Sequence, residues 1–263
     1  MPLINGRNVS VFDSPEELAE AAAQKFIAEA NSAIKARGRV AFALAGGQTP
    51  RRVYELLGTE FANSVEWQSV NLFFGDERCV PPGHVNSNYR MVQESLIAKV
   101  PIPAANVHRM MGEAGALEGA ALYERELKNF FTGQVWPRFD LVFLGLGTDG
   151  HTASLFPGSS ALNETEKWVS AAEAADHSDR ITLTFPVINN AAHVVFIVTG
   201  KEKASSLRAV LGDADGDVSS LPPARHVKPA NGLLEWLVDR NAAALLLASA
   251  MHVAQCPEDD DEN

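Results

Sequence analysis

Continuous apolar runs alternate with amphipathic segments along the whole chain. Apolar residues dominate the runs at 39–46, 69–75, 139–147, 180–185 and 193–200, which is typical of strands buried on both faces of a parallel sheet. The segments between them carry apolar residues at helical spacing. Strands separated by helices predict right-handed crossovers and a mostly parallel sheet with helices on both faces. The pattern therefore predicts an α/β fold of three layers, α/β/α, with a Rossmann-like sheet.

Several helices have recognisable start signals. Ser14, followed by Pro15 and Glu17, forms a capping box for a helix that runs to about Arg37. Thr49 is expected to cap the next helix, over 50–58. Further helices are predicted over 88–100, 115–131 and 201–211, and a closing helix over 231–248. No repeat or linker divides these elements, so residues 1–250 are predicted to form one domain.

Composition narrows the function classes. The chain has 263 residues, of which 46% are hydrophobic, enough to bury a substantial core. Its net charge is −11, and no basic stripe is present, so nucleic acid is not an expected partner. Part of the negative charge lies at 257–263, which predicts a disordered acidic tail over 251–263.

Targeting and redox features are sparse. No apolar run reaches the roughly 18 residues of a membrane span, and the polar N-terminus has no signal-peptide core, so no membrane partner is expected. The two cysteines, Cys79 and Cys256, are far apart in sequence and predict neither a disulfide framework nor a metal site. These features predict a cytoplasmic protein.

The segment LGLGTDGHTASLFPG, residues 144–158, permits two interpretations. Its glycines match the G-x-G-x-x-G pattern of dinucleotide-binding folds, which requires a long helix starting at the second glycine. Pro157 and Gly158 interrupt such a helix after about two turns, which argues against a nicotinamide cofactor. In the second interpretation Asp149 and His151 are catalytic groups at the end of a strand. A neutral imidazole takes a proton from water near pH 7, and a carboxylate selects its tautomer.

Other strand ends carry further candidate residues. The loop Gly46-Gly47-Gln48-Thr49 presents backbone N–H groups before a helix, as an anion site does, and it lacks the lysine of a P-loop. Asp76 and Arg78 follow the next strand, and Arg180 opens the strand at 180–185. Lys203 lies where a helix begins, which is unfavourable for a cation unless an anion binds there. The histidines show no metal-ligand spacing, so no metal is predicted.

Taken in order, AGGQTP, FFGDERCVPPGHVNSNYRM, FDLVFLGLGTDGHTASLFPG, RITLTFPVINNA and VTGKEKA resemble the 6-phosphogluconolactonase family. The resemblance covers residues 10 to 250 and implies a fold related to glucosamine-6-phosphate deaminases. It implies cofactor-free hydrolysis of 6-phosphogluconolactone in the pentose phosphate pathway. His151 is then the proton-transfer group, and Asp149 supports it. The loop 46–49 with Arg78, Arg180 and Lys203 is then the phosphate and sugar site.

Two alternatives stay open. The deaminases have a tyrosine after their DE pair and a glutamate after the GHIAF stretch, where this chain has Arg78 and LFPG. Asp76 nevertheless stands where the deaminases have a general base, so its role is open between proton transfer and orientation of Arg78. A non-catalytic sugar-phosphate sensor is the third hypothesis. The expected partner is a small sugar-phosphate lactone, and the expected assembly is a monomer or a small homo-oligomer.

Overall fold

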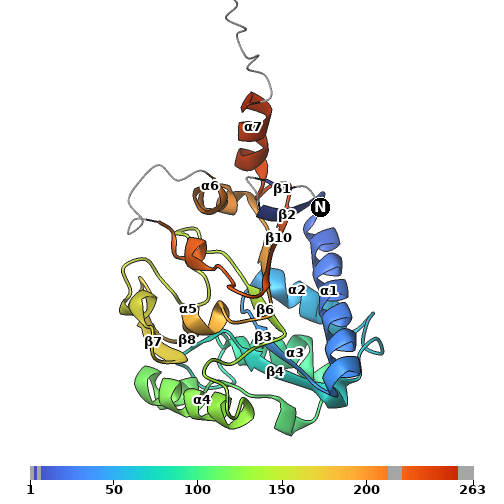
Figure 1. Ribbon diagram of the computed structural model, residues 1–263, viewed down its shortest axis with the longest axis vertical. Coiled ribbons are helices and arrows are strands. Elements are labelled where there is room, and N and C mark those ends of the chain that lie inside the picture. Colours follow the sequence, from blue (N-terminus) through green and yellow to red (C-terminus); the bar gives the residue numbers. More distant parts are fainter. Residues whose placement is uncertain (1–2, 5–6, 213–220, 254–263) are drawn as a thin grey trace, which may run out of the picture.

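A seven-stranded sheet forms the centre of the protein, in the order β1-β2-β10-β9-β6-β3-β4 (Figure 1). The computed structural model describes residues 3–4, 7–212 and 221–253. All pairings in this sheet are parallel except the one between β1 and β2. The strands are β1 (Leu3–Ile4), β2 (Arg7–Phe12), β3 (Val40–Leu44), β4 (Val70–Phe74), β6 (Leu141–Leu144), β9 (His193–Val198) and β10 (Leu233–Asp239). The predicted α/β class with a mostly parallel sheet is confirmed.

Helices lie on both sides of this sheet. In Figure 1, α1 runs along the right side of the sheet, and α6 lies on its left. Ser14 caps α1 through its hydroxyl, which accepts the Glu17 N–H at 3.2 Å, as the capping box predicted. The α-helices are α1 (Pro15–Arg37), α2 (Gln48–Gly58), α3 (Asn88–Ser95), α4 (Ala116–Phe130), α5 (Phe185–Ile188), α6 (Ala204–Leu211) and α7 (Ala244–Val253).

The closing helix predicted over 231–248 is wrong in its first half. That segment forms β10, which pairs in parallel with both β2 and β9. The last five residues of β10 are buried. The run LLEWLVD is mostly apolar, as expected for a strand that has a neighbouring strand on each side and lies inside the protein. A short apolar run of this kind fits a buried strand and a helix equally well by periodicity alone. The helix follows as α7 and ends at Val253, and the rest of the predicted tail, 254–263, lies outside the described residues.

A second sheet of three antiparallel strands lies beside the first, in the order β5-β8-β7. It consists of β5 (Asp76–Arg78), β7 (Val169–Glu173) and β8 (Asp179–Leu183). The run at 180–185 was expected to continue the main sheet, and that expectation is wrong, because within the described strands β8 pairs with β5 and β7. The consequence is that β8 holds Arg180 directly opposite Arg78.

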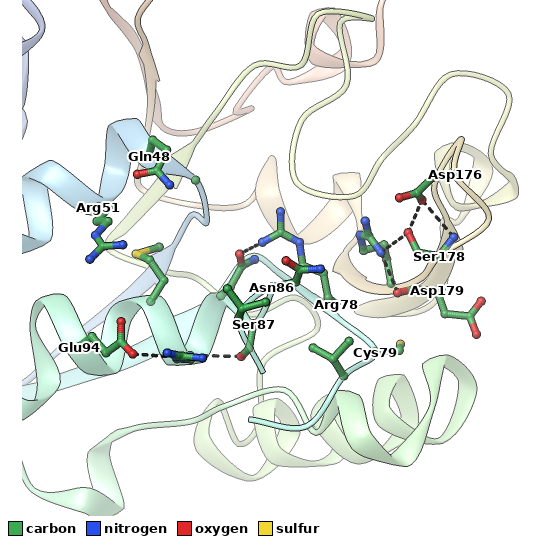
Figure 2. A pocket seen from close by; sticks show the side chains of 17 residues that line it. Gln48, Arg51, Arg78, Cys79, Asn86, Ser87, Glu94, Asp176, Ser178 and Asp179 are labelled. Atoms are coloured by element: carbon green, nitrogen blue, oxygen red, sulfur yellow. Dashed lines mark hydrogen bonds and ion pairs between the residues drawn. The ribbon is translucent and has the colours of Figure 1, made fainter. Parts of the chain in front are cut away.

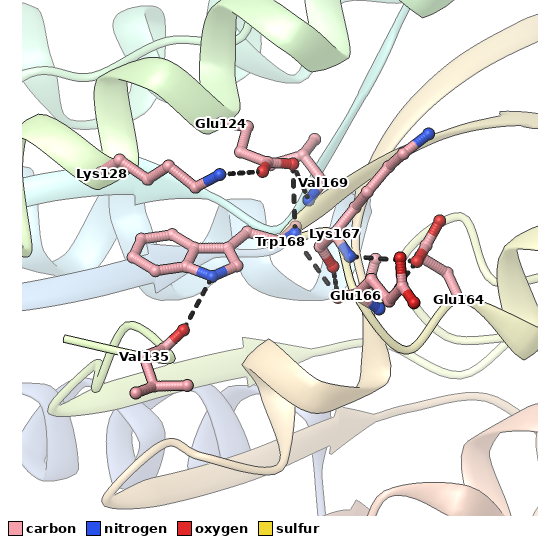
Figure 3. A network of polar contacts seen from close by, with 9 residues as sticks. Glu124, Lys128, Val135, Glu164, Glu166, Lys167, Trp168 and Val169 are labelled. Carbon is pink, nitrogen blue, oxygen red and sulfur yellow. Dashed lines mark hydrogen bonds and ion pairs between the residues drawn. The ribbon is translucent and has the colours of Figure 1, made fainter.

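Helix α4 holds this small sheet in place through one carboxylate (Figure 3). Glu124 accepts the backbone N–H groups of Trp168 and Val169 at 3.2 and 3.4 Å, and it pairs with Lys128. The indole N–H of Trp168 donates to the Val135 carbonyl at 3.0 Å. The backbone N–H groups at the start of β7 therefore have hydrogen-bond partners on α4. These contacts fix β7 and its partner β8, the strand that carries Arg180.

Two buried residues of the main sheet, His193 on β9 and Glu235 on β10, form a network of charges with partly exposed residues of α1. His193 Nδ1 lies 3.1 Å from Glu29, and its Nε2 lies 3.5 Å from Glu235, which also pairs with Lys25 at 2.7 Å. Burial alone lowers the pKa of His193, but the two carboxylates outweigh it and raise the pKa above its ordinary value of 6.5. Glu235 has its pKa lowered to about 2, chiefly by His193 and despite burial.

This group predicts a pH-dependent stability. Because the folded-state pKa of His193 is raised, its contribution is complete below pH 6.5 and is lost as the pH rises through the folded pKa. His193→Gln is expected to lower the free energy of unfolding at pH 6 by about 3 kcal/mol, since it removes one partner of a buried ion pair. Urea unfolding between pH 6 and 9 measures both effects. A variant with the same alkaline loss of stability as wild type would contradict the assignment.

Within the described residues, no helix is both long enough and apolar enough to cross a membrane.

Candidate active site

A cavity of about 510 Å³ opens beyond the carboxyl ends of β3, β4 and β6. The chain passes from β3 to β4 on one side, whereas β6, β9 and β10 lie on the other, so the order reverses between β3 and β6. Ligands of open α/β sheets bind at such a reversal. The predicted site residues that line this cavity are Gly46, Gly47, Asp76, Arg78, Asp149, His151, Arg180 and Lys203.

An imidazole–carboxylate pair stands on the loop after β6. His151 Nδ1 lies 2.6 Å from Asp149 Oδ1, and the same oxygen accepts the backbone N–H of His151 at 3.1 Å. Burial alone raises the pKa of Asp149, but the bonds from His151 outweigh it and keep this pKa below its usual range. In the neutral imidazole, an ionised Asp149 favours the tautomer with the proton on Nδ1, which makes Nε2 the acceptor. Among the described residues, Nε2 has no hydrogen-bond partner.

Gly147 leaves the space in which this pair sits. A Cβ at Gly147 would overlap both the His151 ring and the Asp149 carboxylate. The Gly147 N–H also donates to the His151 carbonyl at 2.8 Å, which closes the loop on itself. The glycine is thus required by the close approach of the side chains. In the dinucleotide interpretation it would have been required by a pyrophosphate.

Gly147→Ala is expected to lower kcat by about a hundredfold, because a small misplacement of a catalytic group costs that much. The matched control is Gly83→Ala, where a Cβ meets nothing within 4 Å. Steady-state kinetics on both variants, with melting temperatures to confirm folding, measure the effect. If the two alanine variants lose activity equally, the close packing at Gly147 is irrelevant to the pair.

Two arginines are paired on neighbouring strands of the small sheet. Arg78 on β5 is the direct partner of Arg180 on β8, an arrangement of like charges that is destabilising unless an anion lies between them. Burial and the neighbouring Arg78 lower the pKa of Arg180 from its ordinary value. Its guanidinium donates to Ser178 Oγ at 2.7 Å, and both arginines line the cavity. The pair is therefore suited to a dianionic phosphate.

Lys203 contributes a third cation. It ends a short 3₁₀ turn, Lys201–Lys203, directly before α6, and it is half-buried at the cavity wall. Within the described part of the chain its ammonium has no hydrogen bond or ion pair. A partly buried cation at the start of a helix gains stability from a bound anion.

The glycine loop before α2 differs in part from its prediction. Gly47, with φ 105°, stands at the N-cap position and α2 begins at Gln48, so the expected cap by Thr49 is wrong. Thr49 does not line the cavity, and its hydroxyl lies 2.6 Å from that of Thr199. Gln48 lines a second, adjoining cavity of about 560 Å³ (Figure 2). The two cavities share Gly47, Arg78, Asn88, Asp176 and Arg180.

The sequence reasoning missed several residues of the site. Asn88 and Asp176 line both cavities, and Ser154 and Phe156 line the first. The centroid of the Phe156 ring lies 4.6 Å from that of the His151 ring, so Phe156 packs against the imidazole. Asn88 had one usable signal, its place after Ser87 at the first turn of a predicted helix. The others lie in loops whose course the local sequence does not specify.

Two other kinds of ligand, a metal ion and a dinucleotide, place their own demands on the residues of a site. In the described residues no group of three or more histidine, cysteine or carboxylate side chains is arranged to hold a metal ion. Between Gly145 and Thr184 the described chain contains turns, the 3₁₀ helix Ser160–Asn163 and two strands. In this described segment no α-helix begins after the glycines, and a helix N-terminus is the element that binds the pyrophosphate in dinucleotide folds.

Comparison with known proteins identifies relatives of this chain. The family model "Glucosamine-6-phosphate isomerases/6-phosphogluconolactonase" matches residues 13–236. A 6-phosphogluconolactonase of Nostoc sp. is 35% identical over 243 residues, covering 91% of this chain and 98% of that protein. The 6-phosphogluconolactonase of Rattus norvegicus is 39% identical over 243 residues, with 90% and 93% covered.

Solved structures share the fold of this chain. The 6-phosphogluconolactonase from Trypanosoma brucei superposes with a TM-score of 0.83 at 31% identity, covering 90% of this chain and 98% of that one. A monomeric glucosamine-6-phosphate deaminase shares the fold, with a TM-score of 0.72 at 22% identity and 90% and 99% covered. The chain therefore belongs to the family of glucosamine-6-phosphate isomerases and 6-phosphogluconolactonases.

Proposed function

We propose that this enzyme hydrolyses 6-phosphoglucono-1,5-lactone to 6-phosphogluconate, with His151 as the proton-transfer group. One observation carries the proposal: an imidazole oriented by a carboxylate lies in the same cavity as three cations from three separate segments. The names of the relatives at 35% and 39% identity support the same reaction. The cavity places these charged groups beside apolar side chains such as Phe156, and the proposed substrate is a small sugar phosphate with an activated ester.

Arg78, Arg180 and Lys203 hold the phosphate of the substrate in this proposal. Binding energy gained at the phosphate, remote from the reacting carbon, fixes the ring and makes the attack of water a positioned step. The phosphate also relieves the repulsion between the two arginines. The N-terminus of α2, reached through Gly47, adds backbone N–H groups for the sugar or the phosphate.

His151 carries the protons. Its Nε2 takes a proton from the attacking water, while Asp149 stabilises the imidazolium that forms. The water oxygen bonds to C1, and N–H groups or a cation of the cavity stabilise the oxyanion. When the tetrahedral intermediate collapses, the imidazolium returns the proton to the ring oxygen, which leaves as a hydroxyl. The lactone is an activated ester, so no covalent intermediate or bound metal is required.

Deamination of an amino-sugar phosphate is the second candidate, and Asp76 favours it because its carboxylate lines the cavity. Against it, this chain has Arg78 and the segment LFPG where the deaminases have a tyrosine and a glutamate. The third candidate is a sensor that binds the sugar phosphate without reaction.

We further propose that residues 1–250 form one domain and that the enzyme works in the cytoplasm as a monomer or small homo-oligomer.

The deciding experiment follows proton release from freshly generated lactone with and without the protein. If the protein is a lactonase, we expect proton release well above the spontaneous rate, and we expect the rate to saturate as the lactone concentration rises. Ammonia release from glucosamine 6-phosphate, with no effect on the lactone, would establish the deaminase instead. Calorimetric binding of 6-phosphogluconate without acceleration would establish the sensor.

A further inference from the structure

Asp76 is the centre of a chain of hydrogen bonds that joins the two sides of the cavity. Its Oδ2 accepts from the Ser154 hydroxyl at 2.7 Å, and its Oδ1 accepts from Asn88 Nδ2 at 3.2 Å. Ser154 and Asn88 are 1% and 2% exposed, so both donors are fixed by their surroundings. Each oxygen of this carboxylate is therefore engaged by the protein itself.

The Asn88 arm of the chain leads to the phosphate site. Asn88 Nδ2 also donates to the Asp76 carbonyl at 2.9 Å, and its Oδ1 accepts from the Arg78 guanidinium. Its backbone N–H donates at 2.7 Å to Glu77, a buried carboxylate that also accepts from the Arg78 and Tyr89 N–H groups. Asn88 is thus anchored at the start of α3 and sets the direction of Arg78.

The Ser154 arm leads to the catalytic loop. Ser154 lies three residues after His151, and its N–H donates to the Thr182 hydroxyl on β8 at 3.2 Å. Between His151 and Ser154, Ala153 has φ 47°. A residue with a side chain keeps this left-handed conformation only when its neighbours hold it. Ser154, bonded on both its N–H and its hydroxyl, supplies that hold.

We propose that Asp76 is a positioning residue that fixes Arg78 and the His151 loop relative to each other, and that it transfers no proton. The inference rests on the proposed function and answers the question that Asp76 raises through its place in the cavity. His151 presents an Nε2 without a partner among the described residues, whereas both Asp76 oxygens accept from buried side chains. The two arms have separate consequences. Loss of the Ser154 arm lowers kcat, and loss of the Asn88 arm raises KM.

A comparison of Asp76→Asn with Asp76→Ala tests the central claim. An asparagine keeps both contacts, because its Oδ1 can accept from Asn88 while its Nδ2 donates to the Ser154 oxygen. Asp76→Ala is expected to lower kcat/KM by about a hundredfold, and Asp76→Asn by no more than about tenfold. The acid limb of the pH profile of kcat/KM is expected to persist in Asp76→Asn. Equal losses in the two variants, or loss of that limb, would show that Asp76 transfers a proton.

Variants of the two arms keep the test independent of whether Asp76→Ala folds. Ser154→Ala is expected to lower kcat by about tenfold with KM nearly unchanged, since it releases only the loop. Asn88→Ala is expected to raise KM by about tenfold and to weaken calorimetric binding of 6-phosphogluconate by a similar factor. Ser95→Ala is the matched control, because Ser95 is also buried, at 2% exposure, and among the described residues its hydroxyl bonds to Met91 of its own helix α3.

The coupling between Asp76 and Ser154 gives the last criterion. If they form one unit, the double variant Asp76→Ala/Ser154→Ala is no slower than Asp76→Ala alone, and additive losses overturn the proposal. Wild-type hydrolysis is measured in the same series. An inactive wild type refutes the proposed function, whereas an active wild type with additive or unsplit effects refutes the positioning role alone.

Discussion

His151→Asn is expected to lower kcat for lactone hydrolysis by about two to four powers of ten, the usual contribution of a general base. The amide cannot accept a proton from water, and the shorter side chain leaves Asp149 without its partner on Nδ1. KM is expected to change little, because the phosphate is held by cations on other segments. Initial rates of proton release, corrected for spontaneous opening, give kcat and KM separately.

His177→Asn is the matched control for this variant. His177 makes the same kind of contact, with Nδ1 2.5 Å from Glu173, but its side chain is 87% exposed and lines neither cavity. Its left-handed backbone, φ 60°, is one that asparagine tolerates. Activity near wild type is expected in the control. A folded His151→Asn protein with unchanged kcat would remove His151 from the mechanism.

The contact between His151 and Asp149 could be predicted because the two residues are neighbours in sequence. Asp149 and His151 are two residues apart, so a turn after a buried strand is enough to pair them. Arg78 and Lys203 were predictable for a related reason, since the carboxyl ends of parallel strands meet at one edge of the sheet. Arg180 reaches the cavity by a different route from the one expected, on a strand of the small antiparallel sheet.

Contacts between residues far apart in the sequence could not be predicted. Ser154 and Asp76 are 78 positions apart, and their hydrogen bond depends on how the small sheet sits against the catalytic loop. The same reason explains β10, whose apolar run fits a strand only once β2 and β9 flank it. Such pairings depend on the whole fold. Local periodicity does not indicate which strand or loop will lie beside a given segment.

Arg180→Gln is expected to raise KM for the lactone by about ten- to a hundredfold with a smaller change in kcat. Charge-assisted hydrogen bonds to a phosphate contribute about 1.5–3 kcal/mol, which corresponds to that range. The unliganded variant is expected to be at least as stable as wild type, because the substitution removes the like charge opposite Arg78. Kinetics and thermal unfolding on the same preparation measure both effects.

The stability measurement separates a phosphate site from a structural arginine. With 6-phosphogluconate at about a hundred times its Kd, wild type is expected to gain about 2.7 kcal/mol of unfolding free energy, and Arg180→Gln much less at that concentration. Arg208→Gln, at an exposed position on α6, serves as the control and should keep the full gain. If Arg180→Gln is destabilised without ligand and gains as much from 6-phosphogluconate as wild type, Arg180 supports the small sheet and the phosphate binds elsewhere.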